Sequence, residues 1–341
     1  MEWTVAIGID THKDTHTAVA LDRLGAQLAS CEIETTRVGY LRLLQFAQAL
    51  GEPAFAIEGA GSYGAGLASL LLASGFSVYE VERPRRRERR RGKSDLLDAA
   101  RAAARLLSGD GLSRLRGGGQ ARDDLRLLLL ERRSALRAQT AALNQLHAVL
   151  VSGPAELRER LAGLSGAALA RRCLRLRPSA DSEQVLASVL RRLAARWRAL
   201  AGELANLDSQ LKQIVSTLAP ELLDECGAGP VCAAQLVVSS GEPTRMKSEA
   251  SFAALAGTSP VEASSGPIRR HRLNRGGDRQ LNWALHVIAR TRIRCHAETG
   301  AYHERLLARG KSKREAIRCV KRQLARHFYR LLLANPTLTS T

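Results

Sequence analysis

The sequence has few aromatic residues, no closely paired cysteines and no long apolar run. Aromatic side chains make up 4% of the 341 residues, so we do not expect nucleic-acid binding to depend mainly on bases stacking on aromatic rings. Six cysteines are scattered without a Cys-x-x-Cys pair, which argues against a disulfide framework or a zinc knuckle and fits a reducing cytoplasm. No apolar run approaches the roughly 20 residues that span a bilayer, and we expect neither a signal peptide nor a membrane partner.

Positive charge, in contrast, is abundant. The chain has 52 Lys and Arg against 33 Asp and Glu, a formal net charge of +19, while 45% hydrophobic and 25% charged residues are values of a globular protein. Nucleic acid is the commonest partner of such a field, because neutralising phosphates releases condensed counterions. We therefore expect arginine to bind a phosphate backbone.

The first third of the sequence alternates strand and helix patterns. Apolar runs at residues 5–9, 17–21 and 27–33 predict three consecutive strands. The pattern continues with a helix at 38–50, a strand at 54–57, a helix at 65–73, a strand at 77–81 and a helix from Ser94. The order βββαβα, followed by a further strand and helix, is that of a ribonuclease H-like α/β domain with a mixed sheet.

The remaining two thirds are predicted to be mainly helical. Residues 123–150 are rich in Leu and Arg and contain no Gly or Pro, and residues 182–218 carry apolar residues near heptad spacing. Two such long helices indicate a coiled-coil hairpin or a dimerisation arm. A small helical domain rich in Arg, Gly and Ser begins near Pro220. We therefore predict three domains: an α/β domain at 1–115, a helical coiled-coil arm at 120–218 and a mainly helical C-terminal domain at 219–341.

Four carboxylates lie at places where an active site would form. Asp10 ends the first strand and Glu58 ends the fourth, and adjacent central strands would bring them together. Asp95 and Asp98 share one face of the helix that Ser94 caps. Neighbouring carboxylates raise one another's pKa unless a cation intervenes. Hard oxygen ligands suit Mg²⁺ or Mn²⁺, and two such ions can hold the oxygens of an in-line phosphoryl displacement.

Each of these residues also has a plainer explanation. Asp95 and Asp98 are typical first-turn charges of a helix, Asp10 could belong to a turn, and Glu58 could begin a loop. A competing metal site is offered by His12 and His16, which could bind zinc or another transition metal.

Several motifs together resemble the DEDD-type insertion-sequence recombinases, the transposases described as bridge-RNA-guided and related to the Piv site-specific invertases. The motifs that resemble the family's DEDD signature are Gly8–Lys13, Ile57–Gly59 and Lys93–Ala99. The likeness continues with a helix-hairpin-helix turn at Cys226–Cys232, with Phe252–Pro260 leading into Ser264–Gly266, and with a basic turn at Asn274–Leu281. Pro267 and His271 depart from the Gly- and Lys-rich turn of the family.

This resemblance implies a RuvC-like domain that binds Mg²⁺ or Mn²⁺ through Asp10, Glu58, Asp95 and Asp98. It also implies that Ser265, in the C-terminal domain, attacks the scissile phosphate and forms a phosphoserine link to DNA. Further implied partners are donor and target DNA, a noncoding guide (bridge) RNA and further copies of the chain in a homodimer or homotetramer, in the bacterial cytoplasm at the nucleoid.

The serine chemistry is physically reasonable, although a Ser-Gly-Pro cluster is more often a simple loop. Glu262 and His271 are the nearest candidate bases of Ser265. Metal ions at the carboxylates could instead lower the pKa of the hydroxyl and neutralise the phosphate. Gly266 would let a phosphate approach the backbone closely.

Basic residues gather in three places that we expect to contact nucleic acid. Before Asp95 these are Arg85, Arg86, Arg87, Arg89, Arg90, Arg91 and Lys93. Around the serine they are Arg269, Arg270, Arg272 and Arg275, and on one face of the last helix they are Arg314 and Arg318 with Lys321, Arg322 and Arg326. Gly227 and Gly229 would allow backbone N–H groups to contact phosphate. The plainer explanations are a solvated charged face and an ordinary interhelical turn.

We therefore predict an insertion-sequence transposase that cleaves and rejoins DNA. A metal-dependent, structure-selective nuclease that hydrolyses junctions with water is the first alternative. A non-catalytic basic protein that binds nucleic acid is the second.

Overall fold

A computed structural model describes residues 3–81, 94–115, 119–178, 184–262, 271–272 and 274–339, without the side chains of Arg114 and His271. The chain divides into two compact units, 1–117 and 118–341. Several predicted site residues lie outside the described residues: Arg85, Arg86, Arg87, Arg89, Arg90, Arg91, Lys93, Ser265, Arg269 and Arg270.

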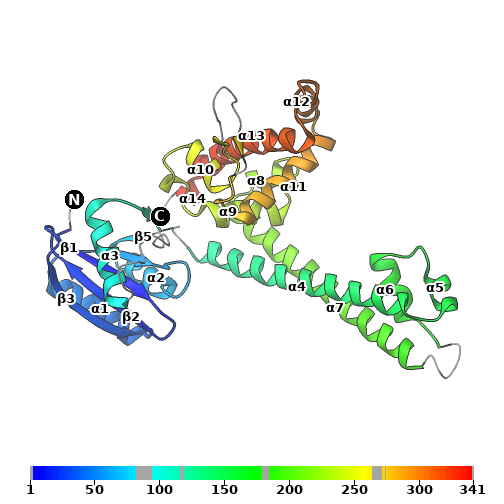
Figure 1. Ribbon diagram of the computed structural model, residues 1–341, viewed down its shortest axis with the longest axis horizontal. Coiled ribbons are helices and arrows are strands. Elements are labelled where there is room, and N and C mark those ends of the chain that lie inside the picture. The colour runs from blue at the N-terminus through cyan, green and yellow to red at the C-terminus, as the bar shows by residue number, and fades with distance from the viewer. Residues whose placement is uncertain are drawn as a thin grey trace. The chain divides into compact units, whose positions relative to one another are not determined.

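The first unit is built around a mixed six-stranded sheet with the order β3-β2-β1-β4-β5-β6 (Figure 1). Strand β1 is parallel to β4, and β4 is parallel to β5, while the other neighbours are antiparallel. The elements are β1 (Val5–Thr11), β2 (Thr15–Leu21), β3 (Gln27–Glu34), α1 (Arg37–Ala49), β4 (Pro53–Glu58), α2 (Ala65–Ala73), β5 (Ser77–Val81), α3 (Asp95–Ser108) and β6 (Leu112–Arg114). The mixed α/β sheet is thus as predicted, whereas the short edge strand β6 was not.

The two faces of this sheet are covered differently because strand side chains alternate between faces. The large residues Ile7, Ile9 and Ile57 pack in one buried cluster with residues of α1 and α2. The intervening small residues of β1 and β4 pack against α3 in a second cluster, which includes Ala6, Ala54, Ala56, Ala99, Ala102 and Ala103. The continued alternation assigns Asp10 and Glu58 to the face that α3 covers.

The close contact between β1 and α3 depends on small residues. A Cβ atom added to Gly8 would lie 2.0 Å from the carbonyl oxygen of Ala99 and 2.3 Å from the nitrogen of Ala103. Glycine is therefore the residue that lets the helix lie against the middle of the strand. This packing carries the N-terminus of α3, with Asp95 and Asp98, toward the end of β1.

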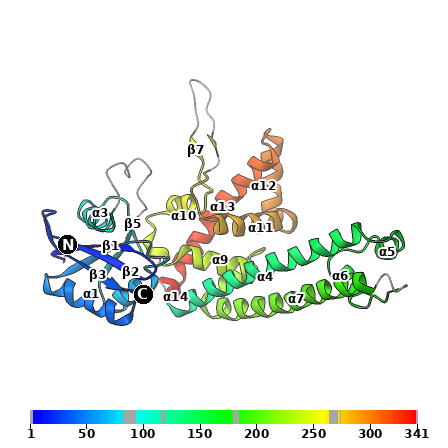
Figure 2. The same ribbon diagram turned by 60° about the horizontal axis from the view of Figure 1, so that its bottom comes forward.

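In the second unit, two long helices run side by side (Figures 1 and 2). These are α4 (Gln120–Val151) and α7 (Gln184–Leu218), and α5 (Ala155–Leu161) and α6 (Gly166–Leu174) lie at one end of the pair. Arg132 of α4 pairs with Asp208 of α7, with 2.5 Å between Nε and Oδ1. Both long helices were predicted from the sequence, α4 from its lack of Gly and Pro and α7 from its apolar spacing.

The C-terminal helices pack around the other end of this pair. They are α8 (Glu221–Asp224), α9 (Pro230–Ser240), the 3-10 helix η3 (Pro243–Arg245), α10 (Glu249–Leu255), α11 (Arg279–Cys295), α12 (Ala297–Ala308), α13 (Lys313–Ala334) and α14 (Pro336–Thr339), with the two-stranded pair β7 (Val261–Glu262) and β8 (His271–Arg272). Their buried cluster includes Leu125 of α4 and Leu211 of α7, so the long helices share one core with the C-terminal helices. No helix among the described residues is long and apolar enough to cross a membrane.

Candidate metal centre and nucleic-acid surface

The end of β1 and the start of α3 bring three potential metal ligands together. His12 Nδ1 lies 3.9 Å from Asp10 Oδ2, and His12 Nε2 lies 3.9 Å from Asp95 Oδ1. One ligand atom from each of the three residues falls within 4.8 Å of the other two. The imidazole of His12 therefore lies between two carboxylates that are 85 residues apart in the sequence.

The electrostatics of Asp10 favour a cation at this point. Burial raises the pKa of Asp10 above its ordinary value, and the neighbouring charges of Asp95 and Asp98 raise it further, while His12 and the Thr11 backbone lower it. The side chain of Asp10 is 13% exposed and that of Asp95 is 54% exposed. A divalent ion would remove the repulsion that disfavours the charged form of Asp10.

Glu58 and Asp98 lie close to this group without belonging to it. Glu58 is the direct register partner of Asp10 across the parallel β1–β4 pair, and its backbone oxygen accepts a 2.7 Å hydrogen bond from Thr11 Oγ1. Asp98 accepts a 2.7 Å hydrogen bond from Arg101 on the same helix. The sequence prediction of adjacent strands is therefore confirmed, and the four carboxylates lie at one end of one sheet face.

Sequence reasoning treated His12 as a possible partner of His16, and the structure separates their roles. His16 is fully buried and stacks on Tyr40, with 5.8 Å between ring centroids. Among the described residues the potential ligand group contains Asp10, His12 and Asp95 but not His16. The alternative zinc site needs both histidines as ligands, and among the described residues they do not belong to one ligand group. His12 joins the carboxylates instead, and the signal was its position two residues after Asp10.

The donor set suits a hard divalent cation. Carboxylate oxygens are the ligands that Mg²⁺ and Mn²⁺ prefer, and a single imidazole is compatible with Mn²⁺ as well. The residues that would hold such an ion are Asp10, Asp95 and His12, with Glu58 and Asp98 beside them.

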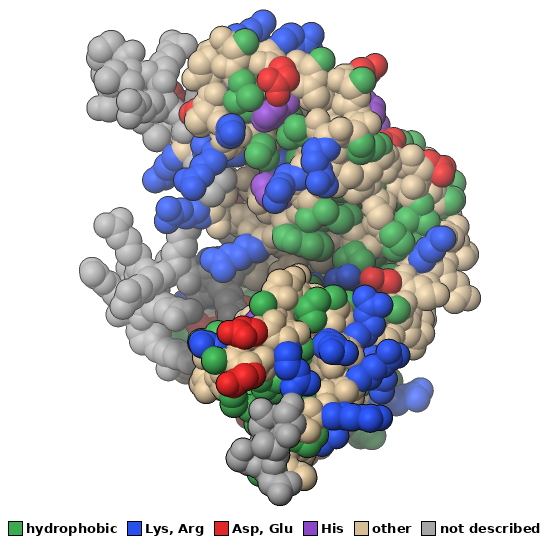
Figure 3. Space-filling view, turned by 90° about the vertical axis from the view of Figure 1, so that its right-hand side faces the viewer, with side chains coloured by type: hydrophobic (Ala, Val, Ile, Leu, Met, Phe, Trp, Pro, Cys, Tyr) green, Lys and Arg blue, Asp and Glu red, His purple; other side chains and the backbone are tan. Residues whose placement is uncertain are grey.

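The second unit exposes some of the basic residues that were predicted to form a surface, and buries at least one of them. Figure 3 shows one face of the protein, on which Lys and Arg side chains are widespread and Asp and Glu side chains are few. Arg272, Arg275 and Arg314 are exposed, and Arg318 is partly exposed. Lys321 is buried at 6% exposure, so the predicted single basic face of α13 is wrong at this position. The side chain turns into the protein because α11 packs there.

The glycine pair after α8 has a clear structural function. Gly227 has φ +84°, and a Cβ atom there would lie 3.1 Å from Thr291 Cβ on α11. Gly229, which caps α9, has no atom within 4 Å of an added Cβ. Gly227 is therefore required by turn geometry and by its packing on α11. Whether the backbone of this turn also contacts phosphate stays a prediction.

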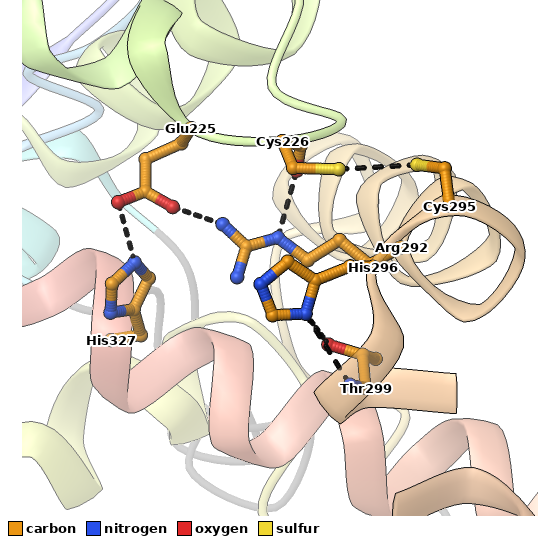
Figure 4. A network of polar contacts seen from close by, with 7 residues as sticks. All are labelled: Glu225, Cys226, Arg292, Cys295, His296, Thr299 and His327. Atoms are coloured by element: carbon orange, nitrogen blue, oxygen red, sulfur yellow. Dashed lines mark hydrogen bonds and ion pairs between the residues drawn. The ribbon is translucent and has the colours of Figure 1, made fainter. Parts of the chain in front are cut away.

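A polar network fastens the same turn to α11 and α13 (Figure 4). Glu225 pairs with Arg292 Nη2, and Glu225 Oε1 lies 2.9 Å from His327 Nε2. Arg292 Nε also donates a 2.8 Å hydrogen bond to the backbone oxygen of Cys226, whose Sγ lies 3.1 Å from Cys295 Sγ. The sequence contains no indication of this network, because its contacts join residues at least 66 positions apart.

We expect Glu225→Gln to destabilise the second unit by about 1–3 kcal/mol near neutral pH, because a largely buried Arg292 loses its carboxylate. Burial raises the pKa of Glu225, but the hydrogen bonds and charges of His327 and Arg292 lower it more, so it lies below the ordinary 4.5. The stabilisation is therefore present above pH 4.5 and is lost as the pH falls through the lower folded-state pKa. Denaturant unfolding at about pH 7 and about pH 3.5 measures this. Exposed Glu203→Gln is the control, and an equal loss at both pH values would contradict the expectation.

Comparisons with known proteins define the class. Residues 7–153 match the family model for DEDD transposases of IS110 type, described as Transposase, and residues 220–304 match the model described as Transposase IS116/IS110/IS902 family. The first match spans Asp10, Glu58, Asp95 and Asp98. The two family matches, together with the arrangement of these four carboxylates, define a DEDD-type transposase.

The chain belongs to the IS110 family of insertion-sequence transposases. It is also similar to the "Insertion element IS110 uncharacterized 43.6 kDa protein" of Streptomyces coelicolor, with 31% identity over 134 residues. This match covers 38% of the chain and 33% of the relative. The chain therefore matches about a third of the length of that curated relative.

Proposed function

We propose that this protein cleaves and rejoins DNA during transposition of an insertion sequence, through Ser265 and divalent ions held at the DEDD carboxylates. The observation that carries the proposal is the register of Asp10 and Glu58 on the sheet face covered by α3, whose first turn presents Asp95 and Asp98. In a member of the IS110 family, this arrangement accounts for the two carboxylates of the DEDD motif that lie on strands and for the two that lie on α3.

In the proposed reaction, Ser265 Oγ attacks a DNA phosphorus atom. The Oγ–P bond forms as one P–O bond of the backbone breaks, and the departing DNA oxygen takes up a proton. Because the phosphodiester is exchanged and not hydrolysed, a second DNA hydroxyl can reverse the step and release the serine. Mg²⁺ or Mn²⁺, when bound, would neutralise phosphate charge and lower the pKa of the serine hydroxyl. Asp10 and Asp95 would supply oxygen ligands beside His12, and we propose that Glu58 and Asp98, which lie next to this group, complete the set.

The proposal includes the finer architecture expected from the sequence. The first unit corresponds to a RuvC-like domain, α4 and α7 to a coiled-coil arm, and the turn at Gly227 and Gly229 to a helix-hairpin-helix element. The proposed division at residues 1–115, 120–218 and 219–341 places two domains within the second compact unit, 118–341. The mixed sheet order and the paired long helices support these assignments.

Donor and target DNA are the proposed substrates, and a guide RNA and further copies of the chain are the proposed partners. The formal charge of +19 supports polyanionic partners. The proposed contacts are the basic run at 85–93, the arginines at 269, 270, 272 and 275, and Arg314 and Arg318.

The test is a denaturing gel that detects covalent protein–DNA complexes formed with Mg²⁺, element-end DNA and element-derived RNA. The wild-type protein is expected to give an adduct that EDTA prevents. Ser265→Ala is expected to give none, whereas Ser264→Ala serves as the neighbouring control. DNA cutting by Ser265→Ala without an adduct would establish the nuclease alternative, and a normal adduct from Ser265→Ala would show that another nucleophile acts.

A further inference from the structure

A strongly basic cavity lies within the second unit, beside the β7–β8 pair. It has a volume of about 670 Å³ and is lined by residues from Gly257–Pro260, β8, α12, α13 and the residues just before α13. Five of its lining residues are cationic: Arg272, Lys311, Arg318, Lys321 and Arg322. The one carboxylate in the lining is Glu315.

Glu315 interacts electrostatically with Arg318 and Lys311, but one carboxylate does not balance five cations. Its Oε2 accepts hydrogen bonds of 3.0 Å from the Ser312 backbone N–H and 2.7 Å from Ser312 Oγ, which closes the capping box at the start of α13. Among the described residues, no ion pair within 4.0 Å joins Glu315 to a cation of the cavity. The cavity therefore keeps an excess of positive charge.

Lys321 is held in the cavity wall without a carboxylate. Its Nζ donates a 2.5 Å hydrogen bond to Asn282 Oδ1, and Asn282 Nδ2 in turn donates a 2.6 Å hydrogen bond to the backbone oxygen of Ala256. Burial, together with the charge of Arg318, lowers the pKa of Lys321 to about 8. The asparagine thus orients the ammonium group, which retains N–H donors for a ligand.

Arg322, the next residue along α13, has an unsatisfied donor. Its Nη1 atom is buried and has no hydrogen-bond partner in the described structure. Arg322 feels the charge of Glu249, but among the described residues no ion pair within 4.0 Å joins either Lys321 or Arg322 to a carboxylate. Burying cations without such a partner costs folding free energy, and buried polar groups are normally satisfied. Such an arrangement is expected where a ligand anion completes the hydrogen bonds.

We infer that this cavity binds one backbone phosphate of a DNA strand, with Lys321 and Arg322 as the ligands of its non-bridging oxygens. A phosphate matches an ammonium beside a planar guanidinium, which together offer several donors to its oxygens. The assignment to DNA rests on the proposed function, because Pro260 and Arg272 flank the segment that contains Ser265. The cavity would position the strand next to that segment.

The test compares full-length variants in binding labelled single-stranded DNA, duplex DNA and RNA of the same sequence, in EDTA and over about 50–200 mM salt. Lys321→Met and Arg322→Met are each expected to weaken DNA binding about tenfold and to reduce the salt slope by about one phosphate contact. Lys313→Met removes the same charge from an exposed position on α13 outside the lining and is expected to change affinity much less.

Thermal unfolding distinguishes a ligand site from a structural role. Lys321→Met is expected to melt at or above the wild-type temperature, because an uncompensated buried charge is replaced by an apolar side chain. A binding loss no larger than that of Lys313→Met, a loss confined to RNA, or destabilisation that parallels the binding loss in both variants would overturn the inference. These measurements need no cleavage, so a missing Ser265 adduct would refute the proposed function and leave this comparison intact.

Discussion

Asp10→Asn is expected to abolish divalent-metal binding and to reduce DNA cleavage and adduct formation by about a thousandfold or more. Asp10 lies on β1 beside both His12 and Asp95 and is 13% exposed, so it supplies the most buried carboxylate of this three-residue group. Metal ions stabilise phosphoryl transfer by several kcal/mol, and each 1.4 kcal/mol corresponds to about tenfold in rate. The amide keeps the size of the side chain and removes the negative charge that holds the ion.

Calorimetric titration with Mn²⁺ and the covalent-adduct assay together measure the effect. Asp110→Asn is the matched control, because it makes the same change at an exposed residue just after α3. Wild-type Mn²⁺ affinity in Asp10→Asn would contradict the metal centre. Lost affinity with unchanged cleavage would instead show that the reaction does not use this metal.

Gly8→Ala is expected to be among the most damaging single-methyl changes in the first unit. The new Cβ would lie 2.0 Å from a backbone oxygen and 2.3 Å from a backbone nitrogen of α3, and no side-chain rotation relieves a contact with backbone. Overpacking of a core commonly costs about 1–3 kcal/mol, and we expect the upper end or more. The helix must shift, and Asp95 and Asp98 shift with it, so metal affinity is expected to fall as well.

Gly61→Ala serves as the control in the same unit, because an added Cβ there meets no atom within 4 Å. Thermal unfolding and Mn²⁺ titration of both variants provide the comparison. Equal stability of Gly8→Ala and Gly61→Ala would show that β1 and α3 do not pack as described.

Much of the first unit could be predicted because its pattern is local. The short apolar runs at residues 5–9 and 54–57 predict two strands, and the acidic residues at their ends indicate a site at one end of the sheet. Strand β6 was missed because Leu112–Arg114 is three residues long, too short to show a period. The sequence offers only His16 as an alternative metal-binding partner of His12, because the fold alone brings Asp95 beside it.

Long-range packing explains what the sequence could not predict in the second unit. Helical spacing places Lys321 on a face with Arg314 and Arg318, but burial of that residue depends on Asn282 of α11. Likewise, the pairing of Glu225 with Arg292 and His327 joins three elements. The role of Ser265 rests on family resemblance, since it lies outside the described residues.

Each of the four buried clusters draws its residues from one unit alone. A substitution that disrupts the core of the first unit is therefore expected to leave the core of the second unit folded. Substitutions in the first unit and in the second unit are accordingly expected to change stability independently of each other.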